Sequence, residues 1–194
     1  MSAAPQFAAP ARFAVDYMAG QPRALLGDPG ILAVFGFGAA APERLDDPRY
    51  LNVPLQPHPG AAPCEVWRVD GTVEHGREGD IAWSSNGRLA FGVIEVDESA
   101  HAGAGDPTGM VGAAAHAYAR LAAFIGASQT PHLLKIWNYI DAITLGEGDS
   151  ERYRQFCVGR VRGLGNVDAS RLPAATAIGC RNDARVLQVY WLAA

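Results

Sequence analysis

An arginine within the apolar stripe of an expected helix is the first candidate for chemistry. The segment from Asp149 or Ser150 to about Leu164 predicts a helix, and at 3.6 residues per turn Arg160 falls inside its apolar stripe. That stripe comprises Tyr153, Phe156, Cys157, Val161 and Leu164. A guanidinium enclosed there needs a paired anion, because burying an unpaired charge is costly. Arg160 is expected to form an internal salt bridge, to extend towards solvent, or to bind a ligand carboxylate through two parallel hydrogen bonds.

A lysine beside two aromatic residues is the second candidate. The segment 132–140, HLLKIWNYI, predicts a strand, and alternation places Leu133, Lys135, Trp137 and Tyr139 on one face. A cation next to aromatic rings suits a pocket for an unsaturated, carboxylated ring. Two plainer interpretations stay open, a solvent-facing lysine on an edge strand and an aromatic contact surface between proteins.

Other residue types give weaker signals. The scattered histidines predict no metal site, and no cofactor is expected. Cys64, Cys157 and Cys180 form no CxxC pair and are interpreted as reduced thiols. The acidic residues that follow the strand at 88–96 are interpreted as a solvated end. No catalytic residue can be nominated from these patterns.

Composition limits the class of partner. The chain has 194 residues, a formal net charge of −4 and 49% hydrophobic residues. The negative charge argues against nucleic acid or an anionic membrane as the main partner. No apolar run approaches the length of a membrane span, and the N-terminus lacks the basic and apolar regions of a signal peptide. A cytoplasmic protein with a small anionic ligand is therefore expected.

Strands and helices are expected to position these residues. Short apolar or alternating runs predict strands at 31–37, 64–69, 81–84, 88–96, 132–140, 174–180 and 185–192. The Asn-Gly pair at 86–87 predicts a type I′ hairpin turn, and a second turn is expected at 181–183. Apolar residues at helical spacing predict a helix over 111–125. Residues 1–28 are expected to be irregular and residues 39–63 to form an ordered loop.

This order predicts a mixed α/β fold of the α+β type with two layers. Residues 80–194 would form a ββαβαββ unit with both helices on one face of the sheet. Residues 1–79 would form an N-terminal extension with strands and a proline-rich loop.

Several segments resemble the first half of the chorismatase family. The long segments PHLLKIWNY at 131–139 and ERYRQFCVGR at 151–160 carry most of the resemblance. Shorter matching segments lie at 47–54 (DPRYLNVP), 65–68 (EVWR), 173–179 (PAATAIG) and 189–193 (VYWLA). The resemblance implies a RidA/YjgF-like fold, also described as chorismate mutase-like.

Membership of that family would imply an activity on chorismate. Chorismatases remove the enolpyruvyl group as pyruvate and leave a hydroxybenzoate or a dihydroxycyclohexadiene acid, for secondary metabolism. The reaction would use a carboxylic acid to protonate the enolpyruvyl group, and Arg and Lys side chains to hold the substrate carboxylates. Arg160, Lys135 and Tyr139 match family segments and, with Trp137, are the expected substrate-binding residues. The family commonly has arginine where this chain has Lys135.

The resemblance also implies a missing part. Family members continue beyond the VYWLA segment into a second RidA-like half that holds the catalytic glutamate, whereas this sequence ends at Ala194. A homo-oligomer or a hetero-partner would have to supply that half. The alternative functions are a non-catalytic binding or scaffold subunit and a RidA-type imine deaminase. The deaminase is disfavoured because Ala174 and Ala175 stand where those enzymes have a carboxylate-binding arginine.

Overall fold

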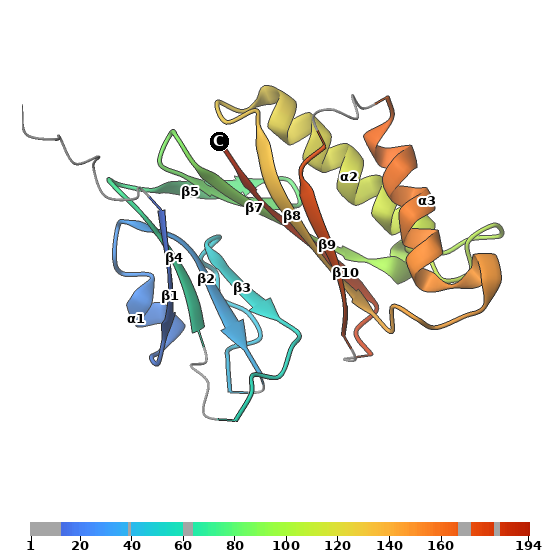
Figure 1. Ribbon diagram of the computed structural model, residues 1–194, viewed down its shortest axis with the longest axis horizontal. Helices are drawn as coiled ribbons and strands as arrows, with labels where there is room; N and C mark the ends of the chain where they lie inside the picture. The colour runs from blue at the N-terminus through green and yellow to red at the C-terminus, as the bar shows by residue number, and fades with distance from the viewer. Residues whose placement is uncertain (1–12, 39, 60–63, 167–171, 181–182) are drawn as a thin grey trace, which may run out of the picture.

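The molecule has three layers, formed by two helices and two sheets (Figure 1). The computed structural model describes residues 13–38, 40–59, 64–166, 172–180 and 183–194. The two longer helices cover one face of a six-stranded sheet, and a four-stranded sheet lies against part of the other face. The predicted mixed fold, with both helices on one face of a sheet, is confirmed. The N-terminal strands add a layer to the two that were predicted.

The four-stranded sheet is built from the N-terminal part of the chain. Its order is β1–β4–β2–β3, in which only the β2–β3 pair is parallel. A short helix, α1 (Pro22–Leu25), precedes β2. The strands are β1 (Phe13–Met18), β2 (Ile31–Phe37), β3 (Tyr50–Val53) and β4 (Cys64–Val69).

The six-stranded sheet holds three of the six segments that resemble chorismatases, those at 131–139, 173–179 and 189–193. Its order is β5–β6–β7–β10–β8–β9, so the C-terminal strand β10 lies at the centre between β7 and β8. Only β8 and β9 are parallel, because α3 connects them. The strands are β5 (Glu74–Glu78), β6 (Ile81–Ser85), β7 (Ala90–Asp97), β8 (Leu133–Asp141), β9 (Ala174–Cys180) and β10 (Val186–Ala193).

Two helices pack side by side on this sheet. They are α2 (Met110–Ala127) and α3 (Arg152–Leu164), and short 3-10 turns cover Glu98–His101 and Gly148–Ser150. By length and hydropathy alone α2 is able to cross a membrane. Its apolar stripe, however, is buried against the sheet, which is typical of the core helix of a globular protein.

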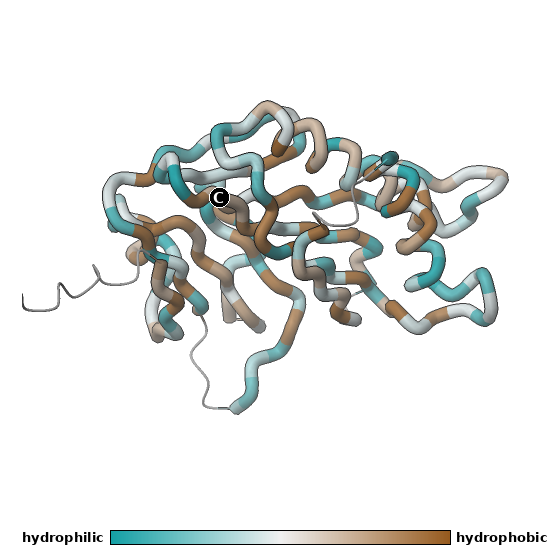
Figure 2. Tube along the Cα trace, turned by 45° about the horizontal axis from the view of Figure 1, so that its top comes forward, coloured by the Kyte–Doolittle hydropathy of each residue, from teal (hydrophilic) through white to brown (hydrophobic). Residues whose placement is uncertain are grey.

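The apolar side chains form one core on each side of the six-stranded sheet. The helix-side core contains Tyr118, Phe156 and Trp191. The inter-sheet core contains the aromatic side chains of Phe35, Trp67, Phe91, Tyr139 and Tyr190 together with aliphatic side chains of both sheets. A third, smaller cluster lies under α1 on the outer face of the four-stranded sheet. Figure 2 shows hydrophobic residues along the strands and hydrophilic residues along the outer loops.

The hairpin predicted around Asn86 is present, but its turn is longer than a type I′ turn. Ser85 pairs with Ala90, which leaves a loop of four residues between β6 and β7. A type I′ turn needs positive φ at both central residues, and here only Gly87 has it (φ 81°). The Asn86 side-chain oxygen instead accepts hydrogen bonds from the backbone N–H groups of Arg88 and Leu89. These side-chain-to-backbone hydrogen bonds take the place of a type I′ turn and give the longer loop.

Four elements were not predicted. Strand β1 and helix α1 lie where irregular chain was expected, β3 lies inside the expected loop, and β5 precedes the predicted hairpin. Leu133 was predicted to share a face of its strand with Lys135, but it packs on the helix side of the sheet. A register shift at Leu192/Ala193 accounts for this, because one extra residue turns the side chains to the opposite face. Residues 181–182 of the predicted second turn lie outside the described residues.

An ion-pair cluster fastens the β5–β6 turn to helix α2. Asp80 accepts hydrogen bonds from Arg120 Nε at 2.8 Å and His116 Nε2 at 2.5 Å. Arg120 also donates to the carbonyl of Glu78 at 3.1 Å. Burial alone would raise the pKa of Asp80, but the hydrogen bonds from Arg120 and His116 outweigh it and lower the pKa below its usual value.

We expect Asp80→Asn to lower the free energy of unfolding by roughly 1 kcal/mol at neutral pH, because each half-exposed ion pair contributes at most about that much. A carboxylate with a lowered pKa stabilises the fold above its unfolded pKa, about 3.9, and this contribution disappears as the pH falls through its folded pKa. Urea unfolding should therefore show a larger difference from the wild-type protein at pH 7 than at pH 3. A difference of equal size at both pH values would contradict the assignment.

Candidate functional site

A cluster of stacked aromatic side chains lies between the two sheets. The Tyr190 ring of β10 stacks on Trp137 at 5.0 Å and on Tyr139 at 5.8 Å, both with an interplanar angle of 13°. Trp67 of β4 meets Trp137 at 5.4 Å, and Phe35 of β2 meets Trp67 at 4.8 Å. Phe35, Trp67, Tyr139 and Tyr190 are at most 5% exposed and belong to the inter-sheet core, so Trp137 is the ring of this cluster that stays partly exposed.

Lys135 lies at the edge of this aromatic cluster. Its ammonium group is 5.0 Å from the centre of the Trp137 ring, in a cation–π contact. Strand β8 runs between β10 and β9, so the interpretation of Lys135 as a lysine on an edge strand is wrong. Lys135 forms no ion pair with any described residue. The predicted grouping of Lys135, Trp137 and Tyr139 on one face is thus present. The ammonium group of Lys135 has no carboxylate partner among the described residues, so it is available to an anion.

The two tyrosine hydroxyls of the cluster stay protonated at neutral pH. Burial raises the pKa of Tyr139, and burial with the neighbouring Tyr139 raises that of Tyr190. The two hydroxyl oxygens lie 3.5 Å apart. As neutral phenols, both can donate a hydrogen bond to an oxygen atom of a ligand.

Glu65 brings a carboxylate to the same region, and the sequence analysis did not single it out. Its Oε1 accepts a hydrogen bond from Trp67 Nε1 at 2.7 Å. Strand pairing places Tyr17 opposite it, and Glu65 raises the pKa of the Tyr17 phenol through a hydrogen bond and its charge. The only signal in the sequence was its two-residue spacing from Trp67, which puts both side chains on one face of β4.

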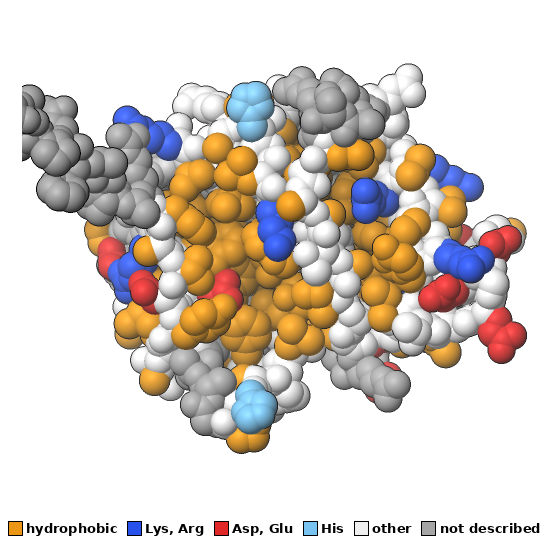
Figure 3. All heavy atoms as spheres, viewed as in Figure 1, with side chains coloured by type: hydrophobic (Ala, Val, Ile, Leu, Met, Phe, Trp, Pro, Cys, Tyr) orange, Lys and Arg blue, Asp and Glu red, His pale blue; other side chains and the backbone are white. Residues whose placement is uncertain are grey.

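The surface over these strands is largely apolar. Figure 3 shows hydrophobic side chains gathered between the two sheets, with basic and acidic side chains among them. Tyr17 is 68% exposed and Val15 is 43% exposed at the rim formed by β1. Of these groups, the ones that a ligand could reach without opening the inter-sheet core are the partly exposed side chains of Glu65, Lys135 and Trp137.

Arg160 lies on the other side of the six-stranded sheet. Its guanidinium is 5.9 Å from the centre of the Tyr118 ring, and the Tyr118 hydroxyl donates to Asn138 on the helix-facing side of β8. Within the described part of the chain it has no carboxylate partner. The sheet thus separates Arg160 from Lys135, and a role for Arg160 in binding a carboxylate stays a prediction for a separate place.

The predicted apolar stripe of the second helix is rotated relative to the observed one. The buried residues of α3 are Arg152, Phe156 and Gly159, whereas Val161 is 67% exposed. Gly159 and Gly163 lie against the backbone of α2, where an added Cβ would collide with the carbonyl groups of Val111 and Ala115 respectively. Glycine gives no hydrophobic signal, so a count of apolar side chains cannot locate the contact face that two glycines form.

The buried arginine of α3 is Arg152, which pairs with an internal carboxylate. Its Nη2 lies 2.8 Å from both carboxylate oxygens of Glu98, and its Nε donates to the carbonyl of Asp141 at 2.8 Å. The side chains of Arg152 and Glu98 are 1% and 0% exposed. Glu98 had been interpreted as a solvated strand end, and that interpretation is wrong. This ion pair joins the turn after β7 to the start of α3 and has a structural role.

Comparisons with known proteins identify the family. Residues 65–193 match the family model described as chorismatase FkbO/Hyg5-like, N-terminal. The chain belongs to the chorismatase family. The resemblance inferred from the sequence is thereby confirmed, including its restriction to the N-terminal part.

Named relatives of this chorismatase-family chain are considerably longer. A chorismatase of Streptomyces rapamycinicus is 33% identical over 134 residues, which are 68% of this chain and 37% of that protein. A chorismatase of Streptomyces hygroscopicus is 35% identical over 118 residues, 59% of this chain and 32% of that protein. A crystal structure of a chorismatase superposes with a TM-score of 0.72 at 27% identity, covering 93% of this chain and 53% of the other. The chain thus spans about half of the solved chorismatase.

Proposed function

We propose that this chain acts on chorismate as the N-terminal part of a chorismatase-type assembly. The reaction would remove the enolpyruvyl group as pyruvate and leave a hydroxybenzoate or a dihydroxycyclohexadiene acid for secondary metabolism. The observation that carries the proposal is the inter-sheet cluster, in which the cation Lys135 borders the stacked rings of Trp137, Tyr139 and Tyr190. Family membership supplies the substrate class.

The chemistry of the cluster fits an unsaturated dicarboxylic acid. Trp137 would stack on the ring and Lys135 would pair with a carboxylate, since both side chains are partly exposed. Tyr139 is 5% exposed, so its predicted hydrogen bond to a ring oxygen would require the two sheets to part. We name no general acid, since the family resemblance assigns it to the second half. Because Arg160 lies on the helix side of the sheet, it would bind only an anion that is held on that side.

The surrounding assembly is part of the same proposal. A second copy of this chain or a separate protein would cover the apolar surface between the sheets and complete the cleft. We further propose a RidA/YjgF-like unit at 80–194 with an N-terminal extension at 1–79, and a cytoplasmic location. The rival function is a binding subunit without catalysis.

Incubation of the purified protein with chorismate, with pyruvate followed through a coupled lactate dehydrogenase assay, tests the proposal. Pyruvate release supports catalysis. Saturable protection from thermal unfolding without pyruvate supports the binding subunit and overturns the catalytic part. If chorismate causes neither pyruvate release nor thermal protection, both the catalytic and the binding proposals are overturned. Ammonia release from an imino acid should stay at background.

Lys135→Met should weaken chorismate binding about 10- to 100-fold, because a charge-assisted hydrogen bond contributes roughly 1.5–3 kcal/mol. Arg162→Met is the matched control, since Arg162 is exposed on α3 and its loss changes the net charge equally. Lys135 is also the sole lysine of the chain, so bound chorismate should protect one identifiable peptide from acylation. Equal affinity in both variants would contradict the role of Lys135.

A further inference from the structure

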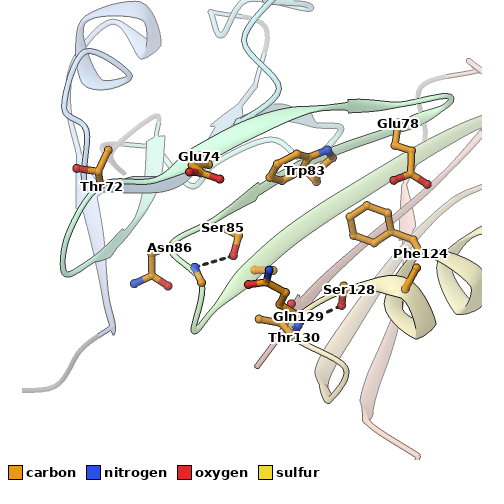
Figure 4. Close-up of a pocket in the computed structure, with 13 residues that line it drawn as sticks. Thr72, Glu74, Glu78, Trp83, Ser85, Asn86, Phe124, Ser128, Gln129 and Thr130 are labelled. Carbon is orange, nitrogen blue, oxygen red and sulfur yellow. Dashed lines mark hydrogen bonds between the residues drawn. The ribbon is translucent and has the colours of Figure 1, made fainter.

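A second candidate site lies on the helix side of the six-stranded sheet. A cavity of about 570 Å³ opens between the β5–β6 hairpin, the start of β7 and the C-terminal end of α2 (Figure 4). This volume lies within the roughly 300–1,000 Å³ of small-molecule sites. Its thirteen lining residues include none of the inter-sheet cluster. The cavity is therefore separate from the proposed chorismate site.

Two aromatic rings line the cavity from opposite elements. Trp83 of β6 lies across Gly76 of β5, where an added Cβ would be 3.3 Å from the indole ring. Glycine at that position leaves the space that the indole occupies. Phe124 of α2 faces the same cavity and packs edge-on against Trp191 at 5.9 Å. The rings provide an apolar wall and a π face.

Two carboxylates flank the indole. Glu74 and Glu78 lie two residues before and after Gly76, so all three share one face of β5. Figure 4 shows the two acidic side chains on either side of Trp83. Neither carboxylate forms an ion pair or hydrogen bond with a described residue, and the lining contains no Lys, Arg or His. Arg120 lies just outside the lining, where it donates to the Glu78 carbonyl and interacts with the Glu78 charge, so the negative charge of the cavity rests mainly on Glu74.

A hydroxyl group in the wall of this cavity has no partner among the described residues. Thr130 is only 3% exposed and lines the wall. Its backbone N–H is bound by Ser128 Oγ at 3.2 Å, but its hydroxyl makes no hydrogen bond within the described ranges of the chain. The hydroxyl oxygen is not among the fully buried side-chain atoms without a partner, so it is accessible from the cavity to water or to a ligand. The neighbouring Gln129 side chain adds an exposed amide.

We propose that this cavity binds a small organic ammonium compound. The charged nitrogen would lie over the Trp83 indole on the side of Glu74, where cation–π attraction and the Glu74 carboxylate act together. Glu78 starts about 13 Å further along the strand and would add a longer-range attraction. The apolar body would pack against Phe124. Binding would weaken as salt concentration rises, because the two carboxylates are exposed.

Calorimetric titration with phenethylammonium chloride tests the proposal. The uncharged 2-phenylethanol and the anion 3-phenylpropanoate have similar shapes and should bind about tenfold more weakly or not at all. Nα-acetyl-lysine methylamide represents a lysine side chain of another protein and should also bind more weakly, because it lacks a ring for Phe124. Binding of the lysine amide as tight as that of the amine would overturn the choice of a small aromatic or apolar compound.

The double variant Glu74→Gln/Glu78→Gln should lower the affinity for phenethylammonium about tenfold. These are isosteric changes of exposed side chains, so the fold is retained. Glu43→Gln removes one exposed carboxylate from the N-terminal part of the chain and should leave the affinity unchanged. The proposal is overturned by absence of binding up to the solubility limit of the amine, or by equal affinity in the double variant. Chorismate binding measured in parallel separates this result from the proposed function.

Discussion

Replacing Arg152 with methionine should lower the free energy of unfolding by about 3–5 kcal/mol, the usual effect of breaking a fully buried ion pair. The loss arises mainly from Glu98, whose carboxylate would stay enclosed without its cation. The hydrogen bond from Arg152 to the Asp141 carbonyl, which fastens the start of α3 to the end of β8, would be lost as well. Urea unfolding at neutral pH measures the difference.

The pH dependence of this loss identifies its cause. Burial raises the pKa of Glu98, and the hydrogen bonds from Arg152 oppose that rise. Without Arg152 the folded pKa should rise further. A carboxyl with a raised folded pKa stabilises the fold below its unfolded pKa, about 4.3, and this stability is lost as the pH rises through the folded pKa. The difference in the free energy of unfolding between the Arg152→Met variant and the wild-type protein should therefore increase from pH 4 to pH 8.

Two further variants complete the test. Glu98→Gln/Arg152→Met removes both charges and should be more stable than Arg152→Met alone, because no buried charge remains unpaired. Arg154→Met is the control on the same helix. Arg154 is 58% exposed with carboxylates no nearer than 3.4 Å, so its loss should change stability by less than about 1 kcal/mol. A pH-independent loss in Arg152→Met would contradict the explanation.

The binding face of β8 could be predicted because a strand has a fixed period of two. Alternation alone placed Lys135, Trp137 and Tyr139 together, and the inter-sheet core confirms that Trp137 and Tyr139 share a face. The partners of these residues were beyond the reach of local patterns. Trp67 and Tyr190 lie 70 and 53 positions away from Trp137 in the chain, and only the packing of the two sheets brings them together.

The N-terminal sheet was only partly predictable for a related reason. Strand β2 is buried along almost its whole length and reads as an apolar run. Strand β1 is a sheet edge with its four central residues exposed, so it has no alternating pattern. Strand β3 has four residues and pairs only with β2, which is too little sequence to separate it from a loop.

The face of α3 was misplaced because the predicted stripe counted apolar side chains only, and glycine has none. Helix propensity favours alanine over glycine by about 0.8–1 kcal/mol, so a glycine retained inside a helix suggests close contact with another backbone. Gly159 and Gly163 are spaced by one turn and both meet the backbone of α2. That contact fixes the rotation of α3, and with it the burial of Arg152 and the partial exposure of Arg160.

Gly159→Ala should therefore destabilise the protein by roughly 1–3 kcal/mol despite the better helix propensity of alanine. The added Cβ would overlap the Val111 carbonyl and lie 2.7 Å from the Ala114 Cβ, which forces α2 and α3 apart. Gly126→Ala is the matched control, since Gly126 lies near the end of α2 with nothing within 4 Å of the added atom. That variant should gain up to about 1 kcal/mol. Thermal and urea unfolding of both variants should give opposite signs, and a gain in both would show that the two helices do not meet at Gly159.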